Sequence, residues 1–143
     1  MRMISDGIWL LLLILLSFLD IKDRQVPGCL LYGAGIYSLI YQVMSDGRDI
    51  FLIFGGIIIG CIFIFISKIT EEGLGYGDSY GILMLGIYLG MWKILSVLLI
   101  AFSLLLCISI LFMWKKRMNR KIAIPFFPFL TGGYFLFILM GGQ

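Results

Sequence analysis

Long apolar runs separated by short charged segments account for most of this chain. Uncharged runs occupy residues 7–19, 28–45, 50–67, 79–92, 94–114 and 122–143. A helix needs about 20 apolar residues to cross a bilayer, so the pattern predicts an all-α integral membrane protein with six transmembrane helices. The intervening segments are too short for a soluble domain. We therefore expect residues 1–143 to form a single transmembrane domain.

The apolar stretch at residues 79–114 contains one charge, Lys93, and is too long for a single span. We expect the chain to turn back between residues 90 and 93, which leaves the fourth helix short. Glycines spaced four residues apart are typical of membrane helices that pack closely. Two such pairs occur here, namely Gly56 with Gly60 and Gly86 with Gly90.

Composition and charge support a membrane protein and predict its orientation. Hydrophobic residues make up 62% of the chain and charged residues 13%, and the net charge of +3 is too small to indicate a nucleic-acid partner. If all six runs span, eight of the 11 Lys and Arg residues fall on one side: residues 22, 24, 68, 115, 116, 117, 120 and 121. Positive loops stay in the cytoplasm. The sequence therefore predicts a multi-pass protein of the plasma or inner membrane with both termini outside.

The cysteines indicate neither a metal site nor a disulfide framework. Cys29, Cys61 and Cys107 are single residues in apolar runs, and the chain has no histidine. We expect all three to be small buried hydrophobic residues, and we expect no metal and no cofactor.

Two aspartates are the strongest candidates for chemistry. The predicted topology places Asp20 at the end of the first helix and Asp78 at the start of the fourth, both at the cytoplasmic face. Acids at the edge of a bilayer are costly and are usually functional. Two carboxyl groups a few ångströms apart can share one proton, so that one takes a proton from water while the other polarises a scissile carbonyl. In the plainer alternative Asp20 is a loop acid and Asp78 only stabilises a helix N-terminus.

A glycine-rich segment precedes the second aspartate, since residues 72–78 read EGLGYGD. We expect Gly73, Gly75 and Gly77 to permit positive φ and close approach of another backbone. A substrate chain could then lie along Gly75, Tyr76 and Gly77. The alternative is a loop that simply turns the chain into the fourth helix.

The segment GYGD, residues 75–78, resembles the GxGD motif of the type IV prepilin peptidases, membrane aspartyl proteases that include the archaeal preflagellin peptidases. Residues 20–27, DIKDRQVP, resemble the family's segment around its first catalytic aspartate. Residues 72–74, EGL, are similar to its Glu-Gly-Met stretch, and residues 124–130, IPFFPFL, resemble its last-helix Pro-Phe signature.

This resemblance implies an aspartic endopeptidase that cleaves the leader of prepilin-like membrane proteins on the cytoplasmic side, after a glycine. Asp20 and Asp78 would be the catalytic dyad, and Gly75 and Gly77 would shape the loop that holds Asp78. Gly81 stands where many members have lysine. The cysteine-bearing domain that bifunctional members use for N-methylation is not found, so we expect peptidase activity without methyltransferase activity.

Two functions of other classes stay open at this level. Paired membrane acids and a last helix broken by Pro125 and Pro128 also occur in ion- or proton-coupled transporters. An inactive scaffold of a pilus or secretion assembly would need neither aspartate. We expect the two prolines to break the regular hydrogen bonding of the last span, with the freed carbonyls satisfied by neighbouring helices or water. A kink beside the active site and a packing feature are both consistent with this pattern. The sequence predicts no oligomeric state.

Overall fold

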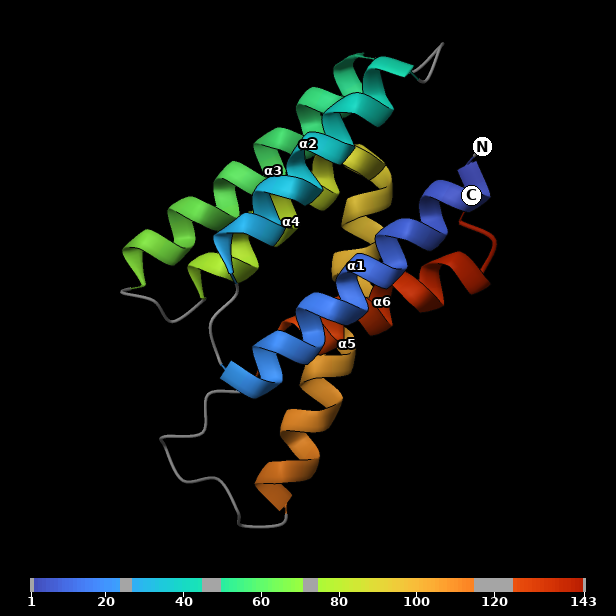
Figure 1. Ribbon diagram of the computed structural model, residues 1–143. Helices are drawn as coiled ribbons and strands as arrows, with labels where there is room; N and C mark the ends of the chain where they lie inside the picture. The colour runs from blue at the N-terminus through green and yellow to red at the C-terminus, as the bar shows by residue number, and fades with distance from the viewer. Residues whose placement is uncertain (1, 24–26, 45–49, 71–74, 115–124, 143) are drawn as a thin grey trace. The chain divides into compact units, whose positions relative to one another are not determined.

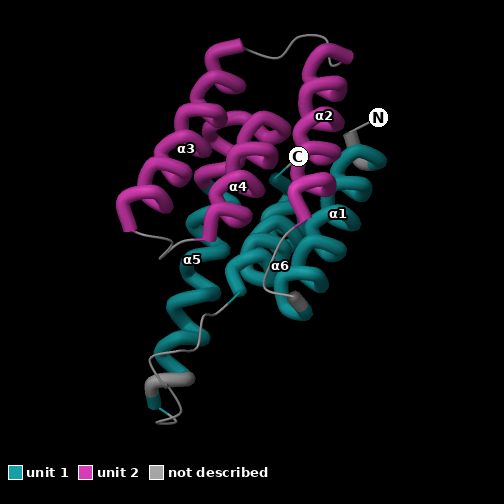
Figure 2. The backbone as a smooth tube through the Cα atoms, turned by 60° about the vertical axis from the view of Figure 1, so that its left-hand side comes forward, with its two compact units in different colours: residues 1–24, 96–143 teal, residues 25–95 magenta. Residues whose placement is uncertain are grey.

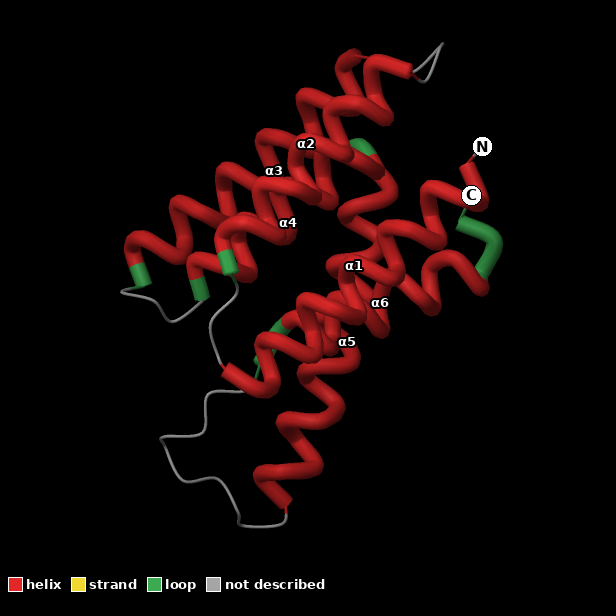
Figure 3. Tube along the Cα trace, viewed as in Figure 1, coloured by secondary structure: helices red, strands yellow, loops and turns green. Residues whose placement is uncertain are grey.

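The computed structural model describes residues 2–23, 27–44, 50–70, 75–114 and 125–142. Within these ranges the chain forms six helices and no strand (Figures 1 and 3), which confirms the all-α prediction. The helices are α1 (Arg2–Asp23), α2 (Gly28–Met44), α3 (Ile50–Ile69), α4 (Tyr76–Leu89), α5 (Met91–Trp114) and α6 (Phe127–Leu139).

Three of the described helices are long and apolar enough to cross a membrane: Ile4–Lys22 of α1, Ile50–Ile69 of α3 and Met91–Leu111 of α5. The helices α2 and α6 are apolar but shorter. The fourth helix has only 14 residues, as its place in the long apolar stretch predicts.

The chain divides into two compact units (Figure 2). Unit 1 contains residues 1–24 and 96–143, and unit 2 contains residues 25–95. In unit 1, α1 packs against α6, and Gly133 of α6 lies close to Val97 and Ala101 of α5. In unit 2, α4 packs against both α2 and α3.

The predicted turn between the fourth and fifth helices is confirmed at Gly90. This residue has φ 80°, a left-handed conformation that glycine adopts without steric cost. Its N–H donates to the carbonyl of Gly86 at 2.9 Å, and α5 begins at the next residue. The fifth helix therefore starts at Met91 rather than at residue 94, because a single glycine is enough to end one helix before the next begins.

Glycines allow α3 and α4 to approach with their backbones in contact. A methyl group added at Gly56 would overlap the carbonyl oxygen of Gly86, and one added at Gly86 would lie 2.7 Å from the carbonyl oxygen of Gly56. In the same way, a Cβ added at Gly60 would lie 2.5 Å from the Cα of Leu83. The predicted packing role of these glycines is confirmed at Gly56, Gly60 and Gly86.

Side chains of α2 hold α4 from the other side. Ser38 is fully buried, and its hydroxyl lies 3.1 Å from the carbonyl of Met84. The amide of Gln42 donates to the carbonyls of Ile87 and Tyr88, the latter at 3.3 Å. The last four carbonyls of a helix have no partner within it, so Gln42 satisfies two of those that α4 leaves open.

The prediction that the cysteines are buried is wrong. Cys29, Cys61 and Cys107 are all exposed, as are many large apolar side chains of the same helices. The reason is that a bundle with an apolar outer surface can carry a small apolar thiol on either face.

The glycine contact between α3 and α4 gives the first prediction. We expect Gly56→Ala to lower the stability of the protein by about 1–3 kcal/mol, because the methyl group must displace the α4 backbone. Thermal unfolding of the purified protein in detergent measures this. Gly33→Ala is the matched control, since an added Cβ there has nothing within 4 Å. An equal unfolding midpoint for the two variants would contradict the close contact.

Candidate active site

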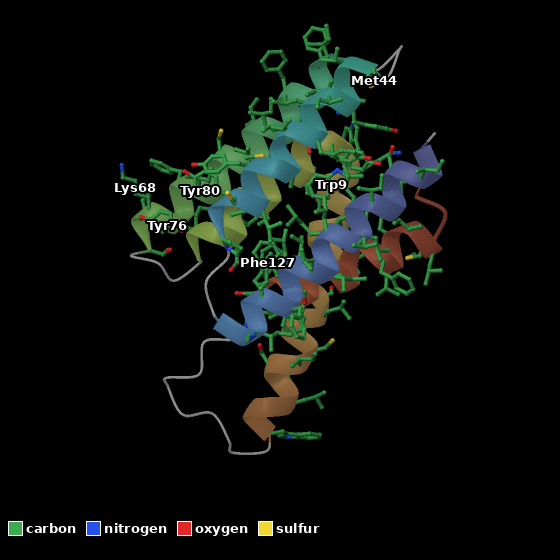
Figure 4. The ribbon with its side chains drawn as sticks, in the orientation of Figure 1. Trp9, Met44, Lys68, Tyr76, Tyr80 and Phe127 are labelled. Carbon is green, nitrogen blue, oxygen red and sulfur yellow. The ribbon has the colours of Figure 1, made fainter. Side chains whose placement is uncertain are left out.

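Asp20 lies in the last turn of α1 and is buried, with 9% of its surface exposed. The backbone N–H of Phe127, the first residue of α6, donates to its Oδ2 at 3.4 Å. Figure 4 labels Phe127 at this point of the helix. The first N–H groups of a helix have no partner within it. The carboxylate of Asp20 thus accepts one of them, where the helix dipole also favours negative charge.

Residues at and just before the start of α6 explain why a helix begins beside Asp20. Pro128 lies in the first turn, where proline is tolerated because its missing N–H would have no partner in the helix. Phe126, the residue before the helix, makes no side-chain cap. It is buried instead, and its ring packs on Phe102 with centroids 5.4 Å apart. An acceptor for the α6 N-terminus must therefore come from elsewhere, and Asp20 supplies one.

The expectation that the two prolines break the hydrogen bonding of the last span is wrong for the described part of that segment. Pro125 precedes α6 and Pro128 lies in its first turn, so neither interrupts the hydrogen bonds of a helix interior. The predicted span also included residues 122–124, which lie outside the described residues. Here the prolines mark the start of a helix, because proline fits the first turn and not the middle.

Asp78 lies in the first turn of α4 and is half-buried. Gly75, which directly precedes the helix, is in contact with it: a Cβ at Gly75 would lie 3.1 Å from Oδ2 of Asp78. Such a distance is too short for comfortable packing, so a side chain at position 75 would press on the carboxylate. Because Gly75 has no side chain, the carboxylate of Asp78 can occupy the space beside it.

The expected positive φ is not found at the motif glycines that the structure describes. Gly75 has φ −57° and ψ 137°, and Gly77 is part of α4. Helix α4 begins earlier than the sequence pattern predicts, at Tyr76, and this gives Gly77 an ordinary helical conformation. At Gly75 the requirement is for space beside Asp78. Gly73 lies outside the described residues.

Ser79 was not predicted as a site residue, yet it holds the first turn of α4 in place. It is fully buried, and its hydroxyl lies 3.2 Å from the carbonyl of Phe63 in α3 and 3.4 Å from that of Gly75. Its own N–H donates to the Gly75 carbonyl at 3.2 Å. The only signal in the sequence is a hydroxyl residue directly after the motif aspartate, at the start of an apolar helix.

The remaining predicted positions lie on the same helix. Tyr76 is exposed at 41% and lies one turn before the exposed Tyr80 (Figure 4). Gly81, where the resemblance leads one to look for lysine, is buried. The structure thus groups Gly75, Tyr76 and Gly77 with Asp78 in unit 2, whereas Asp20 belongs to unit 1.

Metal binding has little support among the residues described. No three Asp, Glu, Cys or His residues in this part of the chain lie close enough together to hold an ion.

Comparison with known proteins identifies a family whose matched range on this chain includes both aspartates. The profile of the type IV leader peptidase family matches residues 7–111, a range that contains Asp20, the segment 75–78 and Asp78. The prepilin leader peptidase/N-methyltransferases of Burkholderia pseudomallei strains 1026b and K96243 are each 29% identical over 128 residues.

These alignments cover 85% of this chain and 41% of each relative, so the chain spans less than half the length of the curated proteins it matches. No solved structure matches at a significant level. Since the family profile covers most of the chain, including both candidate aspartates, the chain belongs to the type IV leader peptidase family.

Proposed function

We propose that this protein is a membrane aspartic endopeptidase that removes the leader peptide of type IV prepilin-like proteins, with Asp20 and Asp78 as its catalytic dyad. One observation carries the proposal. Within the sequence that matches the leader peptidase family, each aspartate is placed at the N-terminal end of a short helix, Asp20 against α6 and Asp78 in the first turn of α4.

The chemistry needs one carboxyl group in each protonation state. Two acids at contact distance share a proton more cheaply than both ionise. The ionised one accepts a proton from water, which then attacks the scissile carbonyl carbon. The protonated one donates a hydrogen bond to the carbonyl oxygen, and the proton taken from water passes to the leaving amine. Because the pair titrates as a unit, neither role belongs permanently to one residue.

The helix ends provide an environment for this charge. Each helix N-terminus carries about half a positive elementary charge, and each of the two helices brings such an end to one carboxyl group. A single negative charge moving between the two aspartates is thereby stabilised wherever it resides. In this proposal the Phe127 N–H holds Oδ2 of Asp20, and the other oxygen of the carboxyl group takes part in the chemistry.

We further propose six membrane spans with both termini outside and the active site at the cytoplasmic face of the plasma or inner membrane. The distribution of Lys and Arg supports this orientation. Helix α4, with 14 residues, is about 21 Å long, shorter than the roughly 30 Å hydrocarbon core. A short span leaves room for water at its end, where Asp78 lies. Residues 1–143 would then act as one transmembrane peptidase domain.

The proposed partners are prepilin-like membrane proteins and the surrounding lipid bilayer. A substrate helix lying in the membrane would bring its leader junction to the cytoplasmic surface, beside the exposed Tyr76 and the segment 75–77. This geometry accounts for cleavage next to an apolar helix.

Replacing either aspartate tests the proposal. We expect Asp20→Asn and Asp78→Asn each to lower the rate of leader cleavage by at least about 100-fold, because an amide can neither accept the proton from water nor return it. The assay is the mobility shift of a prepilin from the same genome, co-expressed with each variant. Asp23→Asn is the matched control and should cleave normally. Wild-type protein that cleaves no candidate prepilin would favour a transporter or an inactive scaffold.

The space beside Asp78 gives a second prediction. We expect Gly75→Ala to lower kcat by roughly tenfold, since small displacements of a catalytic group are costly, while the protein stays folded. Gly33→Ala, where an added Cβ meets nothing within 4 Å, should leave kcat unchanged. Normal cleavage by Gly75→Ala would show that Asp78 does not need the space that the glycine leaves.

A further inference from the structure

The buried face of α1 follows a regular spacing that ends at Asp20. Trp9, Leu13, Leu16 and Asp20 are each at most 9% exposed, and they are separated by four, three and four residues. This is the spacing of a helix whose seam faces a single partner helix. The partner in unit 1 is α6.

Three polar contacts join α1 to α6 along this seam, seven residues apart on α1. The hydroxyl of Tyr134 donates to Oδ1 of Asp6 at 3.2 Å. The hydroxyl of Thr131 lies 3.1 Å from the carbonyl of Leu13. The third contact is the one from the Phe127 N–H to Asp20.

The order of these contacts shows that the two helices run in opposite directions. As the α1 partner moves from residue 6 to 13 to 20, the α6 partner moves from 134 to 131 to 127. Successive contacts on α6 are therefore three and four residues apart, about one turn each. On α1 the same contacts are about two turns apart, and together they define the register of α6, that is, its position along α1.

Thr131 and Tyr134 carry the only polar side chains of α6. The helix reads FPFLTGGYFLFIL, and its remaining residues are two glycines, one proline and large apolar residues. The buried apolar side chains of the two helices are closely packed, and the hydrogen bonds add a stricter requirement, because they are lost when donor and acceptor separate. A slide of one turn, about 5.4 Å, would carry the Phe127 N–H out of reach of Asp20. Tyr134 is fully buried, so its hydroxyl cannot exchange this partner freely for water.

We propose that Thr131 and Tyr134 are positioning residues that fix the register of α6 on α1 and so hold the α6 N-terminus on the carboxylate of Asp20. The effect on catalysis rests on the proposed function. The register itself does not, and it can be measured without any substrate.

The first test reads the register directly. In a protein whose three cysteines are changed to serine, Asp20→Cys and Phe127→Cys introduce thiols on either side of the helix contact. A short bifunctional thiol reagent should join them, and peptide mapping by mass spectrometry detects the product. Adding Thr131→Val with Tyr134→Phe should slow this cross-linking several-fold. An unchanged rate would overturn the proposal, whether or not the protein is a peptidase.

The second test measures cleavage. Because one interhelical hydrogen bond in a membrane protein is a modest interaction, Tyr134→Phe should lower kcat roughly threefold to tenfold with KM unchanged. Asp6→Asn keeps an acceptor oxygen and should retain activity. Asp6→Leu should match Tyr134→Phe, and the double variant should be no worse than either alone.

Two hydroxyl controls complete the design. Thr70→Val removes a hydroxyl that lies 2.8 Å from the Ile66 carbonyl and 3.5 Å from the Ser67 carbonyl. The hydroxyl of Thr131 likewise lies 2.8 Å from the carbonyl four residues earlier, that of Phe127. Tyr32→Phe removes an exposed tyrosine hydroxyl. Both should behave as wild type.

Additive losses for Asp6→Leu and Tyr134→Phe, or an effect on KM alone, would overturn the positioning role. If wild type cleaves nothing, the proposed function fails and the cross-linking result still decides the register.

Discussion

A polar group buried among apolar helices must find its hydrogen-bond partner within the protein, and much of this structure follows from that constraint. Asp20 receives the N–H that begins α6, and Ser79 bonds to the Phe63 carbonyl of a neighbouring helix. Gln42 supplies donors to the carbonyls where α4 ends. In each case one polar side chain is matched to a backbone group of another helix. These contacts determine where the helices begin, where they end and how they are aligned.

The same constraint explains the environment of the two aspartates. A carboxylate in apolar surroundings needs donors, and the start of a helix offers several that the helix itself cannot use. Asp20 uses the start of α6, which follows Pro125 and has Pro128 in its first turn. Asp78 lies in the first turn of its own helix, with Gly75 leaving space beside it. An enzyme that shares one proton between two acids benefits from two helix N-termini. Whichever carboxyl group is ionised then lies near backbone N–H donors.

Features that depend on length and composition could be predicted from the sequence, and features that depend on backbone partners could not. The turn at Gly90 follows from an apolar stretch too long for one span, and the contact of Gly56 with Gly86 follows from glycine spacing. The roles of Ser79, Thr131 and Tyr134 were missed because their partners are backbone carbonyls or residues more than 100 positions away. A carbonyl oxygen leaves no signature in the sequence. The expected break at Pro125 and Pro128 and the expected positive φ at Gly75 and Gly77 were wrong because α6 and α4 start close to these residues.

The pairing of Asp20 with Asp78 is the central claim, and a distance measurement between positions 20 and 78 tests it most directly. With Cys29, Cys61 and Cys107 changed to serine, Asp20→Cys and Asp78→Cys can be treated in native membranes with a short bifunctional thiol reagent and mapped by mass spectrometry. Gly35→Cys with Met84→Cys is the positive control, because a Cβ at Gly35 would lie 2.5 Å from the Met84 sulfur. A dyad predicts efficient cross-linking of positions 20 and 78. Cross-linking of the control pair alone would show that the two aspartates do not meet.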